Sequence, residues 1–275
     1  GTTSIQTGLL VAASTNALGS TAGGTTIQDG AALGFSGGLI FAAEPVTINS
    51  GSSSGVDHIL NVSGVNVFPG AIIRSSTAAL VADFTGGDAG EGLDLTGTFA
   101  YAINMGGTAA GPVQGLTFTN SEGAGTPGFT FTAPLAGTFF TPDYGSTAND
   151  NALEAITQSI RYVGIQPSTV PMRFDNLVVG NRYKLQLIFD ELTGYGGRGF
   201  DVVVDGVTVV DDFGTGQANG VGVGRVVTFE FVANASSSSV QLVGSTALQA
   251  DRSPVINAVT LENLGASLTS VRVAS

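Results

Sequence analysis

The sequence of 275 residues contains no cysteine and no tryptophan, and its nine basic residues include a single lysine, Lys184. The absence of cysteine excludes disulfides, thiol catalysis and thiolate metal sites. The eight arginines are scattered, and 21 acidic residues give a net charge of −12, so no basic patch is available for nucleic acid, phosphate groups or anionic lipid. No apolar run reaches the roughly 18 residues of a membrane helix. We therefore expect neither nucleic-acid binding nor membrane insertion.

The composition is that of a folded chain with an unusually uncharged surface. Hydrophobic residues make up 43% of the sequence and charged residues 11%, and there are 41 glycines. Disordered chains combine low hydrophobicity with high charge, so disorder fits poorly. The length suits two modest β domains. A surface of Gly, Ser, Thr and Ala favours an extracellular or cell-surface location over the cytosol.

Residues 1–87 contain a faint internal repeat. Two related segments begin at Gly1 and Gly24, about 23 residues apart, and each precedes an apolar stretch. Turn residues separate the short apolar segments of this region, which are 9–13, 31–35, 39–42, 46–49, 59–62 and 71–73. Short strands at such a period predict a parallel β-helix, in which each coil stacks on the next. A β-sandwich remains the alternative.

Three segments of this region, 16–33, 44–49 and 60–64, resemble the passenger repeats of bacterial autotransporter adhesins. The resemblance covers about a third of the chain and implies an exported β-solenoid on a bacterial surface. It implies nothing about a ligand. Members of that family carry many more repeats than the three or four coils expected here.

Residues 88–265 change to longer strands in which apolar and small polar residues alternate, as in sheets with one buried face. One helix is expected at 151–162, where Leu153, Ile156 and Ile160 share helical spacing and Asn149 or Asp150 can cap the start. The pair Asp205-Gly206 between two valine-rich runs predicts a two-residue hairpin. These patterns indicate a jelly-roll β-sandwich with one short helix, and an extra strand or tail at 266–275.

Segments 174–189, 199–206 and 256–261 resemble the galactose-binding-like and malectin-like sandwiches found in large secreted bacterial surface proteins. The order of strand, Val-Gly-Asn-Arg-Tyr turn, strand and final asparagine-containing strand carries the resemblance. It implies the jelly-roll fold and raises sugar binding as a function. The whole chain is thus expected to be all-β, with a short parallel β-helix-like region before the sandwich.

Catalytic residues are not evident. The single histidine, His58, lies in a Gly/Ser-rich turn region without a nucleophile elbow, and a solvated loop histidine explains it. The acidic pairs Asp190-Glu191 and Asp211-Asp212 could act on glycosides, but turn and strand-end roles explain them as well. We expect no enzymatic activity, and a secreted glycosidase or lyase is the second alternative function.

Calcium is the ion that the sequence suits best, because acidic residues lie beside glycine-rich loops that can add carbonyl oxygens. The candidates fall in two groups, and ordinary surface acids are the alternative for both. They are Asp83, Asp88 and Glu91 at the junction of the two regions, and Asp211 and Asp212 farther on. No other cofactor is expected.

Sugar binding, the first alternative function, would make the chain a lectin-like adhesin module. Sugars usually stack on aromatic side chains, and tryptophan is missing. Tyr144, Tyr195 and Arg198 are the remaining candidates, since the Gly194–Gly199 segment lies between strands where such folds present ligands. A tyrosine packed on its own loop is the simpler explanation.

The leading hypothesis is a non-enzymatic extracellular structural or surface protein that associates with itself or with other surface proteins. A short β stack needs its end strands covered, by a neighbouring subunit, by the sandwich or by the C-terminal tail. Strand addition between copies would then build a fibre or surface assembly. The residues expected to take part are Ile5, Leu9, Val11, Leu268, Val271 and Val273.

Overall fold

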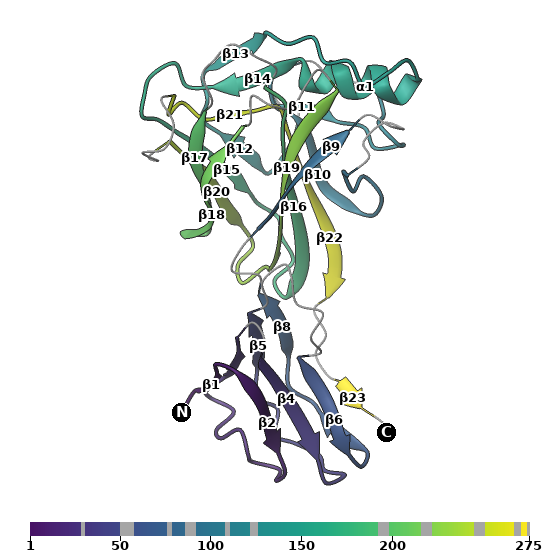
Figure 1. Ribbon diagram of the computed structural model, residues 1–275, viewed down its shortest axis with the longest axis vertical. Helices are drawn as coiled ribbons and strands as arrows, with labels where there is room; N and C mark the ends of the chain where they lie inside the picture. The colour runs from purple at the N-terminus through teal and green to yellow at the C-terminus, as the bar shows by residue number, and fades with distance from the viewer. Residues whose placement is uncertain are drawn as a thin grey trace.

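The computed structural model describes residues 1–28, 31–49, 58–75, 79–85, 92–107, 111–121, 126–191, 198–215, 222–244, 251–266 and 271–273. The chain forms two bodies, one above the other in Figure 1. The smaller, which we call the N-terminal body, contains β1 to β8 and β23, and the larger, the sandwich body, contains β9 to β22 and α1. The predicted all-β fold with one helix is confirmed. No helix among the described residues has the length and apolar character to cross a membrane.

The N-terminal body is a stack of parallel strands. One sheet has the order β1-β3-β5-β8 and a second the order β2-β4-β6, and every pair within them is parallel. The register joins Thr3 to Thr25, Thr25 to Val46 and Val46 to Ile72, so each coil lies directly on the next. This is the short parallel β-helix-like region that the repeat predicts. Its strands are β1 (Thr3–Ile5), β2 (Gly8–Ala12), β3 (Thr25–Ile27), β4 (Ala31–Ser36), β5 (Val46–Asn49), β6 (Ile59–Ser63), β7 (Asn66–Phe68) and β8 (Ile72–Ser75).

Aromatic side chains fill the interior of the N-terminal body. The ring of Phe35 packs 4.7 Å from Phe41 and 5.1 Å from Phe68, measured between centroids, and Ile27 and Leu33 complete the cluster without solvent exposure. Each such side chain contributes about 1.5 to 3 kcal/mol by leaving water. Because the chain has no disulfide, this core is what holds the coils together.

The sandwich body has two large sheets and a small one. The larger sheets have the orders β11-β10-β22-β16-β19-β9 and β12-β15-β20-β17-β18, and β13-β14-β21 lie near α1 at the far end of the body (Figure 1). Its strands are β9 (Leu80–Thr85), β10 (Phe99–Asn104), β11 (Thr119–Asn120), β12 (Phe129–Phe131), β13 (Leu135–Thr138), β14 (Ser159–Tyr162), β15 (Thr169–Phe174), β16 (Asn181–Phe189), β17 (Gly199–Val204), β18 (Val207–Gly214), β19 (Val223–Val232), β20 (Ser238–Val243), β21 (Val255–Ile256) and β22 (Ala258–Ala266).

The six-stranded sheet is buried on both faces. Leu185 and Leu187 of β16 face the second large sheet and pack in one cluster with Phe200 of β17. Ile188, the next residue of β16, belongs to a separate cluster on the opposite face, together with Leu153 of α1. The alternation of side chains along a strand therefore explains both cores. Lys184 and Gln186 precede Ile188 on the second face, so only Leu187 to Phe189 form a continuous apolar run in β16.

The helix α1 (Ala148–Thr157) is shorter than the predicted 151–162. Thr147 is its N-cap, and the Thr147 hydroxyl and the Asp150 carboxylate each accept from the other's backbone N–H. The segment after the helix, which includes Ile160, forms β14 instead and pairs with β13 and β21. Helical spacing alone could not show this, because the pairing partners are distant in the sequence.

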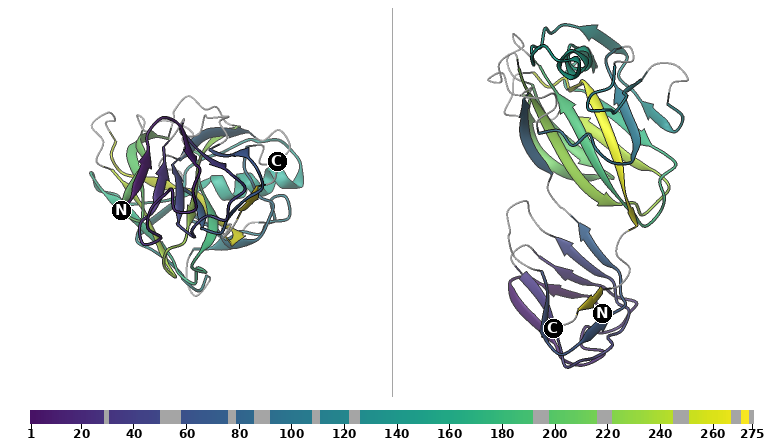
Figure 2. Two further views of the ribbon diagram at one scale, coloured as in Figure 1. Left: turned by 90° about the horizontal axis from the view of Figure 1, so that it is seen from below. Right: turned by 90° about the vertical axis from the view of Figure 1, so that its right-hand side faces the viewer.

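One segment belongs to a different body from the one the sequence indicates, and the C-terminal tail returns to the N-terminal body. Leu80–Thr85 pairs with β19, so β9 is part of the sandwich rather than of the repeat region 1–87. At the other end, β23 (Val271–Val273) pairs antiparallel with β7. The C-terminal strand thus lies in the N-terminal body, as Figure 2 also shows, and it covers β7 rather than β1 or β2.

Asn257 ties the end of α1 to the six-stranded sheet. Its side chain is fully buried, and its Nδ2 donates to the carbonyls of Thr157 at 2.6 Å and Ser159 at 3.0 Å, while its Oδ1 accepts from the backbone N–H of Asp190 at 2.8 Å. Replacement by an apolar side chain would leave all of these backbone groups buried and unpaired.

We predict that Asn257→Ala lowers the free energy of unfolding by about 3 to 5 kcal/mol. Urea denaturation followed by far-UV circular dichroism measures the change. Asn16→Ala is the control, since the Asn16 side chain is exposed and its loss should cost less than about 0.5 kcal/mol. Equal stability of the two variants would contradict the role given to Asn257.

Candidate functional site

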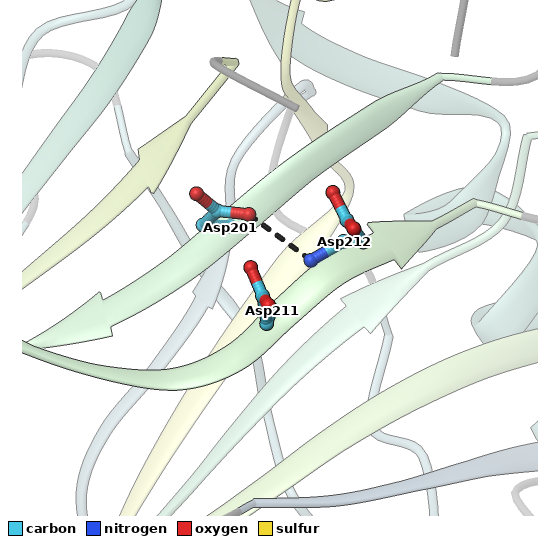
Figure 3. A group of neighbouring side chains, drawn as sticks. All are labelled: Asp201, Asp211 and Asp212. Carbon is cyan, nitrogen blue, oxygen red and sulfur yellow. Dashed lines mark hydrogen bonds between the residues drawn. The ribbon is translucent and has the colours of Figure 1, made fainter. Parts of the chain in front are cut away.

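Three carboxylates meet on the outer surface of the hairpin formed by β17 and β18. Asp201 comes from β17, and Asp211 and Asp212 come from β18 (Figure 3). One oxygen of each lies within 4.8 Å of the others. The turn of this hairpin is Asp205-Gly206, and both residues have positive φ, at 47° and 82°, so the predicted hairpin is confirmed.

A break in strand pairing brings the third acid to the two that the sequence singled out. The β17–β18 register shifts between Phe200 and Val202, and the Asp212 backbone N–H donates to Asp201 Oδ1 at 3.0 Å. Asp212 itself has a left-handed backbone, with φ at 54°. The sequence gives no sign of this register, so the place of Asp201 beside Asp212 could not be predicted from it.

The carboxylate triad, Asp201, Asp211 and Asp212, offers hard oxygen ligands of the kind that Ca²⁺ prefers. Asp201 is half-buried and the other two are exposed. Asp83, on β9, lies apart from the triad and accepts from Arg225 Nε at 3.0 Å, whereas Asp88 and Glu91 lie outside the described residues. Among the predicted calcium residues that the structure describes, Asp211 and Asp212 lie together and Asp83 does not join them.

The candidates for sugar binding are buried where they are described. Tyr144 is 7% exposed, its ring stacks on Phe84, and its hydroxyl donates to Asp190 Oδ2. Arg198 is 6% exposed and forms ion pairs with Glu191 and Asp251. Tyr195 lies outside the described residues. Neither the Tyr144 ring nor the Arg198 guanidinium presents an open face, because each holds neighbouring segments together instead.

Asp190 is a buried carboxyl at the end of β16. Burial raises its pKa to about 7, against an ordinary value of 3.8, and the hydrogen bond from Tyr144 opposes the rise. Burial also raises the pKa of Tyr144, and the neighbouring Asp190 charge adds to that effect. The pair therefore couples the stability of the sandwich body to pH in the neutral range.

The surface of the N-terminal body is apolar near one edge. Leu9 and Val11 of β2 are 51% and 42% exposed, and Val62 of β6 is 48% exposed. Gly34 of β4 lies between them, and a Cβ there would come within 2.7 Å of Val62 Cγ2 and 3.2 Å of Leu9 Cδ1. We call Leu9, Val11 and Val62 the outer apolar face.

The other residues expected in self-association are placed differently. Ile5 is 6% exposed and packs in the interior of the N-terminal body, so it is not a surface residue. Its side chain faces inward because it belongs to the hydrophobic core of this body. Val271 and Val273 lie in β23, which is paired with β7, and Leu268 lies outside the described residues.

We predict that the free energy of unfolding falls as the pH rises through 7. Above about pH 4 the folded state keeps a proton on Asp190 that the unfolded state has lost. The stabilisation that this proton provides is therefore complete below about pH 4 and is lost as the pH rises through 7. Between about pH 5 and pH 8.5 the loss should be about 2 to 3 kcal/mol. Urea titrations of the wild type and Asp190→Asn, which cannot titrate, measure it. Identical pH profiles would contradict the assignment.

We also predict that Ca²⁺ in the millimolar range raises the melting temperature by about 3 to 6 °C through the carboxylate triad. The double variant Asp211→Asn/Asp212→Asn should lose this shift, and asparagine keeps the left-handed backbone at position 212 accessible. Differential scanning calorimetry with and without chelator measures it. Asp83→Asn is the matched control and should shift as the wild type does. A shift that survives in the double variant would place the ion elsewhere.

No protein family and no curated protein matches this sequence. Solved structures share the fold of part of the chain. The plant receptor-like kinase ANX2 is 12% identical with a TM-score of 0.50, and the match covers 62% of this chain and 49% of that one. The ANXUR2 extracellular domain from Arabidopsis thaliana is 14% identical with a TM-score of 0.49, over 62% and 50% of the two chains. A β-glucuronidase from Bacteroides uniformis is 16% identical with a TM-score of 0.44, over 60% and 18%.

These matches span about half of the receptor chains, and at such low identity they show the fold alone. The ANX2 match agrees with the β-sandwich expected from the galactose-binding-like and malectin-like resemblance. The resemblance of residues 1–87 to autotransporter passenger repeats is a prediction from the sequence pattern, and these comparisons give it no support. The chain is therefore similar in fold to the plant receptor-like kinase ANX2 over 62% of its length.

Proposed function

We propose that this chain is a non-enzymatic extracellular structural module that associates with further copies of itself through the N-terminal body. The outer apolar face is the observation that carries the proposal. Leu9, Val11 and Val62 are exposed together on the sheet β2-β4-β6, where each would gain by leaving water.

The position of this face at a sheet edge supports strand addition. In the order β2-β4-β6, β2 and β6 are the two edge strands, and each carries part of the face. Edge strands present backbone N–H and C=O groups that pair readily with another strand. A copy that joins its β2 to β6 of the next copy makes a heterologous contact that does not close. Such a contact builds a fibre.

Charge also favours contact through this body. Residues 1–75 contain three acidic residues and one arginine, whereas residues 76–275 contain 18 acidic and eight basic residues. Residues 1–75 therefore carry a net charge of −2, and Arg272 of β23 brings the N-terminal body to −1, whereas the remainder carries −11. Like charges keep sandwich bodies of different copies apart, while the nearly neutral N-terminal bodies can approach.

An extracellular location fits the same composition. The sequence has one lysine and 11% charged residues, with the Gly, Ser and Thr content of exported β proteins. The alternative based on Tyr144 and Arg198 as sugar ligands loses its support, because both side chains are buried in contacts of their own.

We predict that Val11→Lys abolishes self-association, because each contact would then bury a charge on the outer apolar face. Sedimentation velocity over a range of concentrations, with negative-stain microscopy, measures it. Val178→Lys is the matched control, since Val178 is 54% exposed and lies on the sandwich body.

The wild type and Val178→Lys should form larger species as the concentration rises, and Val11→Lys should stay monomeric. Far-UV circular dichroism checks that all three chains are folded. A wild type that remains monomeric at the highest concentration would refute the proposal. So would a Val11→Lys variant that assembles as well as the wild type.

A further inference from the structure

A polar cleft of about 330 Å³ lies at the end of the sandwich body that carries α1. Four separate segments meet there. They are the residues that follow β10, the strand β11, the strand β13, and the end of α1 together with the start of β14. The side chains and backbone that face it include Gly107, Asn120, Thr138, Ala155, Gln158 and Ser159. None of the described residues that the sequence singled out as sugar or calcium ligands lines this cleft.

The hydroxyl of Ser159 is the most informative group in the cleft. Ser159 is 2% exposed, and its Oγ is buried without a hydrogen-bond partner among the described residues. A Cβ at position 107 would lie 2.8 Å from this oxygen, so glycine there keeps the space in front of the hydroxyl open. A buried hydroxyl without a partner is costly, and a ligand that supplies one removes that cost.

The chemistry of the cleft is polar and uncharged. The carboxamides of Asn120 and Gln158 and the hydroxyls of Thr138 and Ser159 line it, and no acidic or basic side chain among the described residues does. Each of these four groups can both donate and accept a hydrogen bond. Gln158 is held in place, since its Nε2 donates to the Ala155 carbonyl at 3.3 Å.

An ionic ligand would leave its charge without a counterion in such a site. A ligand with several hydroxyl groups matches it, because every hydroxyl also donates and accepts. We propose that this cleft binds a neutral polyhydroxyl ligand, one or two sugar rings in size. The volume lies at the small end of the roughly 300 to 1,000 Å³ of ligand pockets, which limits the bound portion to that size.

The second groove of the sandwich body differs in chemistry. It measures about 200 Å³ and follows β12, β15 and β20, where Phe131, Met172 and Arg173 contribute to its lining. Arg173 already forms an ion pair with Asp175. This groove also contains the neutral side chains of Thr130, Thr132, Ser239 and Gln241, but an apolar surface and the charged Arg173 lie among them, and Gln241 supplies a control position.

The test uses glucose, galactose, mannose and N-acetylglucosamine with their common disaccharides. Saturation-transfer difference NMR detects binding, and calorimetry measures affinity. The full chain carries Val11→Lys in every sample, so that the state of assembly does not affect the result. We expect at least one neutral sugar to bind, and its uronic acid, which differs by one carboxylate, to bind at least tenfold more weakly.

Two cleft variants and one control locate the site. Ala155→Leu fills the cleft from α1 with a good helix former and should abolish binding. Ser159→Ala should weaken binding roughly five- to tenfold, the effect of one hydrogen bond. Gln241→Leu, in the other groove, should bind as the parent does. Absence of binding by every sugar, undiminished binding by Ala155→Leu, or equal affinity for the uronic acid would each overturn the proposal.

Discussion

Pairing between strands that are far apart in the sequence is the constraint on which this protein depends. With no disulfide and few charges, the chain must satisfy its buried backbone groups through sheets. The nine-residue strand β16 illustrates this, because it pairs along most of its length with β19 on one side and β22 on the other. The two larger hydrophobic clusters of the sandwich body rest on this strand. The parallel coils of the N-terminal body obey the same requirement in a different geometry.

The few basic residues are largely committed to the fold. Lys184 lies between Asp94 and Glu262, and Arg198 lies between Glu191 and Asp251. Such buried charges are stable only when they are paired. Because cations are used in this way, the surface keeps an excess of acidic groups. The net negative charge of the chain therefore lies mainly on the sandwich body.

Sequence patterns predicted those features of the fold that depend on residues close together in the sequence. The repeat beginning at Gly1 and Gly24 predicted parallel coils, and Asp205-Gly206 predicted a hairpin. By contrast, the exchange of β9 and β23 between the bodies depends on partners more than a hundred residues away. The burial of Tyr144 could not be read from its neighbours for the same reason, since Asp190 comes from another element. The polar cleft gathers side chains from four segments, and no motif marks any of them.

The return of β23 to β7 makes the sandwich body an insertion within the N-terminal body. Two covalent connections, one after β8 and one after β22, link the two bodies. During synthesis the coil stack cannot add β23 until the whole sandwich has left the ribosome, so the sandwich body can fold first as a unit. A double tether of this kind also restricts twisting of one body against the other. A load applied through the stack would accordingly be shared by both connections rather than concentrated in a single linker.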